Sequence, residues 1–155
     1  QRLLLLARPL LSLHAAVLLW QPGDEQPNYG AIADRLKRRW TEPPRPTTVF
    51  VATNLAARQF AGVAGKLRAE QATHDIHVAA LYLLTRATDP TTAARWWVED
   101  LRGKAGYHIK DPDVLIEDDS GQVVEAIEFG GEYDAKRVEE FHRHCAEREL
   151  PYQLW

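Results

Sequence analysis

The sequence predicts a mixed α/β (or α+β) fold, built in its C-terminal half around a small sheet with flanking helices. Two apolar runs rich in β-forming residues, 107–117 and 122–129, are separated by an acidic turn and are expected to be neighbouring strands. An amphipathic segment, 133–149, repeats its apolar residues at helical spacing. Pro151 then begins a last short strand. Because a helix lies between two strands, the last strand can pair in parallel with an earlier one.

The N-terminal part contains signals for four further elements. The apolar run 9–20 fits a buried strand or a short helix, and periodicity does not decide between them. Asn28 is a favourable N-cap for an amphipathic helix over 29–40. Residues 47–52 form a strand by residue type, and 55–60 form a short helix after it.

Two helices are expected before the predicted sheet. Thr73 is expected to cap a strong helix over 74–86. Asp89 or Thr91 is expected to start a second helix, 93–102, which contains two tryptophans. The C-terminal half is therefore predicted to run helix, strand, strand, helix, strand.

The chain divides by charge into two regions, which we expect to be two domains, 1–70 and 71–155. A small, polar stretch at 62–71 is the candidate boundary. The first region has ten Lys and Arg residues against five Asp and Glu, a net charge of +5, and the second has nine against seventeen, a net charge of −8. A basic region suits phosphates and an acidic region suits metal ions, although an uneven surface charge alone would look the same.

The lone Cys145 excludes an internal disulfide framework and predicts a reducing, cytoplasmic environment. No apolar run is long enough to cross a membrane, so no membrane is expected among the partners. A start at Gln1 without any methionine suggests a fragment or a processed product. The leucine run 3–6 hints weakly at a signal peptide.

The candidate chemistry lies in acidic residues at the ends of the two predicted strands. Asp113 stands on the first strand, and Glu125 and Glu128 stand on the second. Because side chains alternate along a strand, only one of the two glutamates should face the site, and the sequence does not decide which. Two carboxylates amid apolar residues suit a hard cation such as Mg²⁺ or Mn²⁺. The alternative is that these acids only form structural ion pairs, for example with Arg137.

This constellation resembles the PD-(D/E)xK nuclease-like superfamily, which has a restriction-endonuclease-like fold. Pro112–Asp113 resembles its "PD" motif, and Glu125–Ile127 occupies the place of its "(D/E)xK" motif. The resemblance implies an assisting acid on a preceding helix, for which Glu99 is the match. Ile127 stands where the superfamily has the lysine that orients the attacking water. Lys136 on the following helix would therefore have to supply a migrated lysine, because otherwise the site is inactive.

A second resemblance covers most of the chain. The motifs that show it are Thr73–Ala79, Trp97–Asp100, Pro112–Asp113, and Glu125-x-x-Glu128 followed by Gly130. They are similar to the replication-relaxation family, bacterial and plasmid-encoded proteins described as winged-helix DNA binders joined to a nuclease-like domain. The resemblance implies DNA as a partner and a link to plasmid or mobile-element replication. It also implies that residues 1–70 hold all or part of a winged helix, with a small α/β region as the alternative.

On this resemblance the helix 29–40 would face DNA, and basic residues in and after it would contact phosphates. These residues are Arg35, Lys37, Arg38, Arg39 and Arg45. Such contacts position a protein on DNA without specifying sequence. The same residues would equally suit a solvated helix face beside a proline-rich turn.

The histidines give weaker signals. His74 and His77 lie three residues apart on a predicted helix and could share a metal, but no third ligand with clear spacing accompanies them. A capping and packing role is therefore favoured. His142 and His144 are expected at the surface, and Cys145 is expected in the core.

Three functional hypotheses follow. The leading one is a DNA-binding protein whose nuclease-like domain hydrolyses phosphodiesters with Mg²⁺ or Mn²⁺. The second is a non-enzymatic DNA-binding regulator or replication accessory protein with a degenerate nuclease fold. The third is a toxin–antitoxin or mobile-element interaction module in which the acidic half contacts a protein, either a second copy in a homodimer or another protein partner. An exposed apolar patch near Trp155 would favour the third hypothesis.

Overall fold

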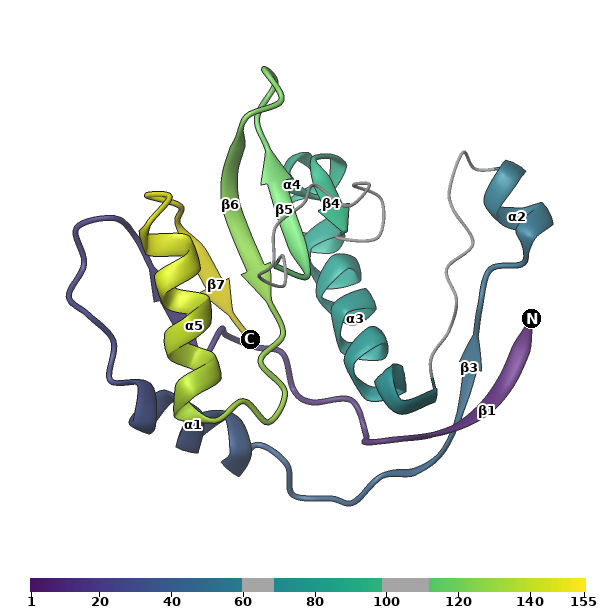
Figure 1. The fold of residues 1–155 in the computed structure, drawn as a ribbon. Coiled ribbons are helices and arrows are strands. Elements are labelled where there is room, and N and C mark those ends of the chain that lie inside the picture. The colour runs from purple at the N-terminus through teal and green to yellow at the C-terminus, as the bar shows by residue number, and fades with distance from the viewer. Residues whose placement is uncertain (60–68, 99–111) are drawn as a thin grey trace.

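The computed structural model describes residues 1–59, 69–98 and 112–155. Over these residues the chain is mixed α+β, with a five-stranded mixed sheet flanked by helices and a separate two-stranded sheet (Figure 1). The strands are β1 (Arg2–Ala7), β2 (Leu18–Trp20), β3 (Arg45–Phe50), β4 (Trp96–Val98), β5 (Val114–Glu117), β6 (Val123–Glu128) and β7 (Tyr152–Leu154). The helices are α1 (Tyr29–Arg38), α2 (Asn54–Gln59), α3 (Ala72–Thr88), α4 (Pro90–Ala94) and α5 (Ala135–Ala146), with a short 3-10 turn at Ala69–Gln71.

The five strands of the main sheet lie in the order β2-β7-β6-β5-β4. β4 pairs antiparallel with β5, and β5 pairs antiparallel with β6. β7 pairs in parallel with β6, with Ile127 opposite Gln153, and α5 makes the crossover between them. The predicted parallel strand pair is therefore confirmed, and β2 adds an antiparallel edge strand next to β7.

Helices cover both faces of this sheet (Figure 1). On one face α1 and α5 pack together over Ala126, Tyr152 and Leu154. On the other face Leu81 of α3 packs against alternate residues of β5 and β6, among them Ile127. Because side chains alternate along a strand, neighbouring residues such as Ala126 and Ile127 belong to opposite cores.

Part of the N-terminal region is built into the same sheet. β2 pairs with β7, and the backbone N–H of Val17 donates to the carbonyl of Leu154 at 2.8 Å. α1 buries Leu36 in the core that also holds α5. Residues 17–36, which were expected in a separate basic domain, therefore share a hydrophobic core with the acidic part of the chain.

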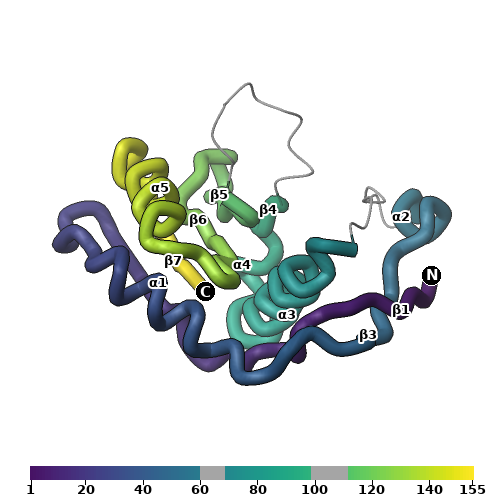
Figure 2. Tube along the Cα trace, turned by 60° about the horizontal axis from the view of Figure 1, so that its bottom comes forward, coloured from purple at the N-terminus to yellow at the C-terminus, as the bar shows by residue number. Residues whose placement is uncertain are grey.

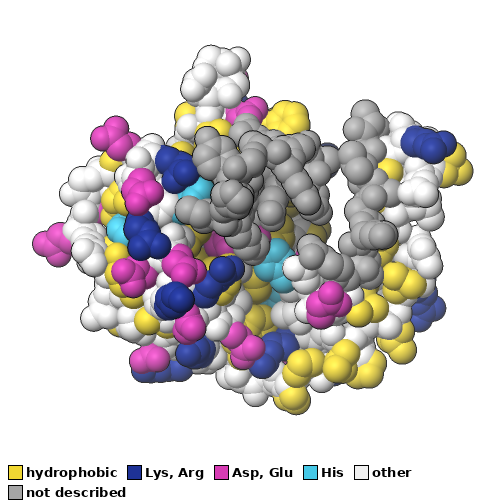
Figure 3. All heavy atoms as spheres, in the orientation of Figure 1, with side chains coloured by type: hydrophobic (Ala, Val, Ile, Leu, Met, Phe, Trp, Pro, Cys, Tyr) yellow, Lys and Arg dark blue, Asp and Glu magenta, His cyan; other side chains and the backbone are white. Residues whose placement is uncertain are grey.

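The leucine-rich start of the chain forms β1, which pairs antiparallel with β3 in a ribbon. This ribbon and α2 lie to the side of the main sheet, beyond α3 (Figure 2). Its outward side chains, Leu4, Leu6 and Phe50, are exposed, and hydrophobic side chains gather over the ribbon at the lower right of Figure 3. Among the described residues, no helix combines the length and the hydropathy that a bilayer crossing requires.

The two amphipathic helices follow their sequence signals closely. Asn28 caps α1 as predicted, and its side chain accepts the backbone N–H three residues later at 3.0 Å. Asp134 caps α5 in the same way, accepting from the N–H of Arg137 at 2.9 Å. Val138 and Cys145 on the predicted apolar stripe of α5 are fully buried. Burial raises the pKa of the Cys145 thiol to about 12, so the thiol remains neutral in the core.

The predicted helix over 93–102 is wrong in its described part. α4 ends at Ala94, and Trp96–Val98 forms the edge strand β4 against β5. Aromatic and β-branched residues favour a sheet over a helix, and pairing with β5 gives their backbone groups partners. The predicted cap at Asp89 is confirmed, because its carboxylate accepts two backbone N–H groups at 3.1 Å each.

Three single-residue expectations are also corrected. Thr73 does not cap α3, which begins one residue earlier, and its hydroxyl instead accepts the N–H of Arg8 at 3.0 Å. His142 and His144 are buried rather than exposed. The reason is that α5 is covered by α1 as well as by the sheet, so a wider face of the helix is enclosed. Nδ1 of His142 lies 3.0 Å from the Tyr152 hydroxyl.

Gly130 lies at a close approach between the end of β6 and α1. A methyl group at this position would lie 3.0 Å from side-chain carbons of both Leu36 and Leu154. Both leucines are completely buried, so they have little room to shift. The glycine therefore allows α1 to pack against the strand end at which the candidate site lies.

We expect Gly130→Ala to destabilise the fold by about 1–3 kcal/mol, because extra volume in a dense core displaces its neighbours. Gly30→Ala is the matched control: Gly30 lies in α1, and a methyl group there would meet only Oδ1 of Asn28, at 3.6 Å. The control should be neutral or stabilising by up to about 1 kcal/mol, because alanine favours a helix. Urea unfolding measures both variants. A midpoint for Gly130→Ala equal to that of the wild type would contradict the packing argument.

Candidate functional site

Asp113 and Glu128 meet at one end of the β5–β6 pair. Asp113 directly precedes β5, and Glu128 is the last residue of β6. The register places Val114 opposite Ile127, so the two acids lie opposite each other. Both residues are buried, with 6% and 3% of their surface exposed. Two carboxylates are thus brought together in largely apolar surroundings.

Reciprocal hydrogen bonds hold the two carboxylates to the opposite strand. The N–H of Asp113 donates to Oε2 of Glu128 at 2.8 Å, and the N–H of Phe129 donates to Oδ2 of Asp113 at 2.9 Å. Backbone N–H donors favour the ionised form of a carboxylate and offset part of the free energy cost of burying it. The two side chains therefore continue the β5–β6 hydrogen-bond ladder beyond its last backbone pair.

A tight turn after β6 returns Tyr133 to Glu128. Gly131 adopts a positive φ of 51°, and the N–H of Tyr133 donates to the carbonyl of Gly130 at 2.8 Å. The Tyr133 hydroxyl then donates to Oε1 of Glu128. Burial and, after it, the charge of Glu128 raise the pKa of Tyr133, so its hydroxyl keeps its proton and remains a donor.

Arg137 brings a positive charge next to this tyrosine. It lies in the first turn of α5, and its guanidinium carbon is 5.1 Å from the centroid of the Tyr133 ring. Burial alone would lower the pKa of Arg137, but Tyr133 and Glu128 raise it overall. The guanidinium therefore stays charged, and its Nη1 lies 3.8 Å from Oε2 of Glu140.

His74 approaches Asp113 from the first turn of α3. Its Nε2 lies 2.9 Å from Oδ2 of Asp113, and its Nδ1 lies 3.2 Å from Oδ1 of Asp75. Each ring nitrogen thus faces a carboxylate, which fixes the orientation of the imidazole. His74 places a nitrogen beside a member of the acid pair, although the sequence motif leads one to look for a lysine there.

A cavity of 540 Å³ opens beside the acid pair. The side chains that contact the two acids, His74 and Tyr133, both line it. Arg8 lines it as well, and its guanidinium lies 2.9 Å from a carboxylate oxygen of Glu132. A ligand in this cavity would therefore meet His74 and Tyr133 first, with the two acids behind them.

The structure separates the two candidate glutamates. Glu125 lies three residues before Glu128 on the same strand, so the two side chains leave opposite faces of the sheet. The carboxylate of Glu125 accepts from Nε2 of Gln153 at 2.9 Å. Burial raises the pKa of Glu125, and the bond from Gln153 opposes this effect. Glu128 is therefore the glutamate that the structure brings to Asp113.

The other predicted site residues are not brought to the acid pair in the described part of the chain. The side chain of Lys136 is 82% exposed, and its Nζ lies 3.9 Å from Oε1 of Glu140. Ile127 is buried in the core beneath α3, so the position expected for the lysine faces apolar residues. Glu99 lies outside the described residues.

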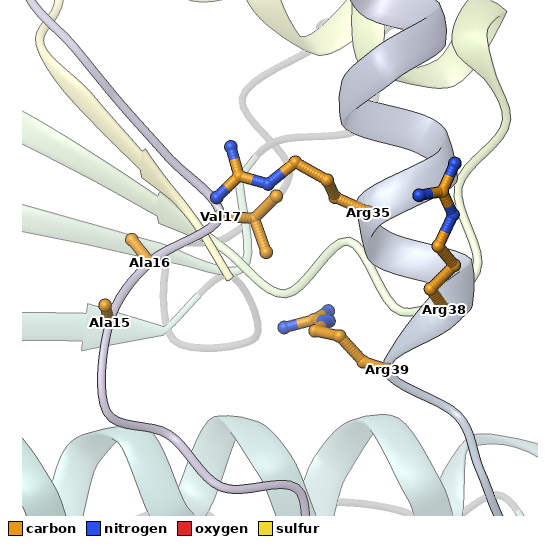
Figure 4. A pocket seen from close by; sticks show the side chains of 6 residues that line it. All are labelled: Ala15, Ala16, Val17, Arg35, Arg38 and Arg39. Carbon is orange, nitrogen blue, oxygen red and sulfur yellow. The ribbon is translucent and has the colours of Figure 1, made fainter.

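Three of the five predicted basic residues border one hollow between α1 and the segment 15–17. These are Arg35, Arg38 and Arg39 (Figure 4). Lys37 is exposed and does not line this hollow. Arg45, at the start of β3, lies 3.5 Å from a glutamate three residues earlier. The structure thus groups the arginines of α1 and leaves the other two basic residues apart from them.

No cluster of three or more His, Cys, Asp or Glu side chains suited to a metal ion occurs in the ranges that the structure describes. His74 and His77 do not form a metal pair, because both ring nitrogens of His77 have partners. Its Nε2 accepts the N–H of Leu11 at 3.0 Å, and its Nδ1 lies 2.6 Å from the Thr73 carbonyl. Two carboxylates can still bind a hard cation when water and substrate oxygens complete its coordination.

Three side chains at the site were not identified from the sequence. The first is His74, through its contact with Asp113. The second is Tyr133. The third is Arg137, through its contact with Tyr133. Gly130 and Gly131 could have predicted the position of Tyr133. Glycines after a strand permit a sharp turn, and such a turn brings the side chain that follows it back to the strand end at Glu128. No local signal exists for His74, since its contact with Asp113 forms only when α3 packs against the sheet.

Comparisons of the chain with models of protein families, with curated protein sequences and with solved structures find no match. The interpretation of the acid pair therefore rests on its geometry and on the sequence motifs.

Tyr133→Phe should destabilise the protein by about 1–3 kcal/mol, because the buried Glu128 carboxylate loses a donor that water cannot easily replace. Tyr82→Phe is the control. The Tyr82 ring packs against Trp96 at 5.6 Å, and within the described residues its hydroxyl has no hydrogen-bond partner. Urea unfolding at pH 7 compares the two variants with the wild type. Equal losses in both variants would show that the Tyr133 hydroxyl adds nothing specific.

The stability of the fold should fall as the pH decreases below about 6.5. Burial lowers the pKa of His77 from its ordinary value of 6.5, so in this range the unfolded chain binds a proton that the folded chain does not. The loss should reach at most about 1.4 kcal/mol per pH unit for one such group, and it is complete below the folded pKa. Burial also lowers the pKa of His142, which adds to the slope.

Urea unfolding between pH 5 and pH 8 measures this dependence. His77→Gln should show a shallower slope than the wild type, whereas His14→Gln, at an exposed position, should keep the wild-type slope. An unchanged slope in His77→Gln would show that the neutral ring of His77 does not govern the pH dependence.

Proposed function

We propose that this chain is a DNA-binding protein whose nuclease-like domain hydrolyses phosphodiester bonds with the help of Mg²⁺ or Mn²⁺. The main support for this proposal is the buried pair of Asp113 and Glu128, opposite each other at the ends of β5 and β6. The resemblance to nuclease-like proteins requires two acids on neighbouring strands of a small sheet flanked by helices, and this pair meets that requirement. The resemblance to the replication-relaxation family adds a role in plasmid or mobile-element replication.

The donor set fits a hard divalent cation. Asp113 and Glu128 offer carboxylate oxygens, and phosphate oxygens and water would complete the coordination. A bound cation would supply a more acidic water and would neutralise negative charge on the phosphodiester. Oε1 of Glu128 already accepts from the Tyr133 hydroxyl. A cation that binds Oε1 of Glu128 would have to share this oxygen with the Tyr133 hydroxyl or displace the hydroxyl. Tyr133 would therefore compete with the cation for Glu128.

The side chains around the cavity suit the rest of the reaction. Hydrolysis adds water to phosphorus and breaks one P–O ester bond, so the departing oxygen needs a proton. Because both ring nitrogens of His74 face carboxylates, His74 would position Asp113 at the cavity, and water would give the departing oxygen its proton. Arg8 lines the same cavity, and its positive charge would favour the approach of a phosphate.

The basic residues of α1 support the proposed binding to DNA. α1 packs its apolar face against α5 and carries Arg35, Lys37 and Arg38 in its last turn. Because α1 is fixed in the core of the sheet, these residues form a rigid surface rather than a loose arm. Phosphate contacts by such residues release counterions, so the affinity for DNA should fall steeply with salt. The resemblance implies that the segment 48–53 is the wing, and β3 of the β1–β3 ribbon includes the first part of this segment.

A second function is favoured by the lack of a water-orienting lysine at the acid pair. Counted from Glu125, the place of this lysine is taken by Ile127, which is buried in an apolar core, and counted from Glu128 it is taken by Gly130. The side chain of Lys136, the possible substitute, is directed to solvent beside Glu140. These observations support a non-enzymatic DNA-binding regulator or replication accessory protein with a degenerate nuclease fold.

The hypothesis of a homodimer or a protein partner is supported at the β1–β3 ribbon and not near Trp155, where an exposed apolar patch was expected. Trp155 is partly buried against the core under α3, and its indole N–H donates to Gln153 at 2.8 Å. The exposed leucines and Phe50 of the β1–β3 ribbon are instead the apolar side chains that a partner could cover.

Calorimetric titration with Mn²⁺ and Mg²⁺, with plasmid nicking followed in parallel, tests the leading proposal. Asp113→Asn and Glu128→Gln should each weaken metal binding by about tenfold or more and abolish nicking, because each removes one of two charged ligands. Glu125→Gln is the matched control. It makes the same charge change on the same strand but on the opposite face, and it should retain both activities.

The outcomes separate the two candidate functions. Circular dichroism and urea unfolding establish that each variant is folded. Metal binding that depends on Asp113 and Glu128 but is not accompanied by nicking would favour the non-enzymatic function. A folded wild type that binds neither cation would refute the metal-dependent nuclease. Salt-sensitive plasmid binding would then remain as the supported part of the proposal.

A further inference from the structure

A second cavity, of 370 Å³, lies between α1 and the segment that leads into β2. Its lining residues are Ala15, Ala16, Val17, Arg35, Arg38 and Arg39. Figure 4 shows the side chains of Arg35 and Arg39 reaching from α1 toward this segment, whereas the side chain of Arg38 runs along the helix. The lining thus contains three guanidinium groups and no acidic side chain.

Arg39 is held at the inner side of this cavity. Its guanidinium carbon lies 5.7 Å from the centroid of the Phe129 ring, and its Nε donates to the carbonyl of Leu36 at 3.5 Å. Nη2 of Arg39 is buried and, in the described part of the chain, has no hydrogen-bond partner. A buried donor without an acceptor is destabilising, and an acceptor supplied by a ligand would remove that cost.

Arg35 and Arg39 repel each other. Burial and, after it, the charge of Arg35 lower the pKa of Arg39 to about 10, which leaves Arg39 charged at neutral pH. Arg38 has a carboxylate partner, because its Nη2 lies 3.7 Å from Asp34 on the same helix. Among the described residues neither Arg35 nor Arg39 forms an ion pair with an acidic side chain. An anion between the two guanidinium groups would replace repulsion by attraction.

We propose that this cavity binds a phosphate group with two negative charges, as in a phosphate monoester. Arg35 and Arg39 would donate to its oxygens, because the planar guanidinium fork matches the geometry of a phosphate. A dianion compensates two guanidinium charges more fully than a singly charged phosphodiester does. The hollow is bordered by six residues and therefore suits one such group rather than a run of backbone phosphates.

Phe129 connects this cavity to the acid pair. Its backbone N–H donates to Asp113, and its ring faces the guanidinium of Arg39. If the phosphate belongs to a nucleic-acid end, the inference rests on the proposed function and adds a subsite that holds the end of the strand. If the phosphate belongs to a free nucleotide or another small compound, the site stands without the nuclease.

Two measurements test the proposal and distinguish the sources of the phosphate. The first is calorimetry with inorganic phosphate at pH 8 and low ionic strength, where screening is weak. The second is fluorescence anisotropy with a single-stranded oligonucleotide that ends in a 5′-phosphate or a 5′-hydroxyl. The wild type should bind inorganic phosphate, and Arg35→Gln, at an exposed position, should weaken this binding about tenfold.

Arg86→Gln is the matched control, because it removes the same charge from an exposed position of α3 outside the cavity. It should bind phosphate as the wild type does. Equal weakening in both variants, or no binding of phosphate by the wild type, would overturn the proposal. A preference for the 5′-phosphate that Arg35→Gln loses would assign the site to a nucleic-acid end. Phosphate binding without this preference would assign it to a small phosphate compound.

Asp113→Asn separates this inference from the proposed nuclease. The variant should keep the wild-type affinity for inorganic phosphate even if it loses metal binding and nicking. A loss of phosphate binding in folded Asp113→Asn would show that the two sites are not separate and would overturn the inference.

Discussion

The reciprocal hydrogen bonds between Asp113 and Glu128 are the constraint on which this end of the molecule depends. A buried carboxylate is strongly unfavourable unless donors surround it. Here the donors are backbone N–H groups of the opposing strand, at 2.8 and 2.9 Å. They are in place only while β5 and β6 keep their register, because a slip of one residue would move each side chain to the other face. The register of the sheet and the burial of the acids therefore stabilise each other.

Phe129 transmits this constraint to the helices. Its N–H is one of the two donors, and its ring stacks on His77 at 4.6 Å and meets the Trp40 ring edge-on at 6.2 Å. His77 belongs to α3, and Trp40 follows α1, where its indole N–H donates to the carbonyl of Gly131 at 3.0 Å. Both helices are therefore positioned against a single strand end.

The parts of the fold that depend on local signals could be predicted from the sequence, and the parts that depend on distant pairing could not. Asn28 and the apolar stripe of 133–149 act within one or two helical turns, and both were identified. Trp96–Val98 becomes a strand only through its pairing with β5, whereas its local sequence predicts a helix. Alternation shows that only one of Glu125 and Glu128 faces Asp113, but the choice between them needs the register, which the sequence does not contain.

The basic and acidic residues, which lie in different parts of the sequence, come close together in the fold. Because α1 shares a core with α5 and the sheet, basic residues of α1 and acidic residues of the C-terminal part border the same packed interior. The guanidinium of Arg39 lies over the ring of Phe129 and has no acidic partner in the described part of the chain. An anion would compensate the charge of the arginines, and a cation would compensate the charge of the two acids. In the proposed function, a nucleic-acid substrate and a divalent cation would bring these two charges to two separate sites.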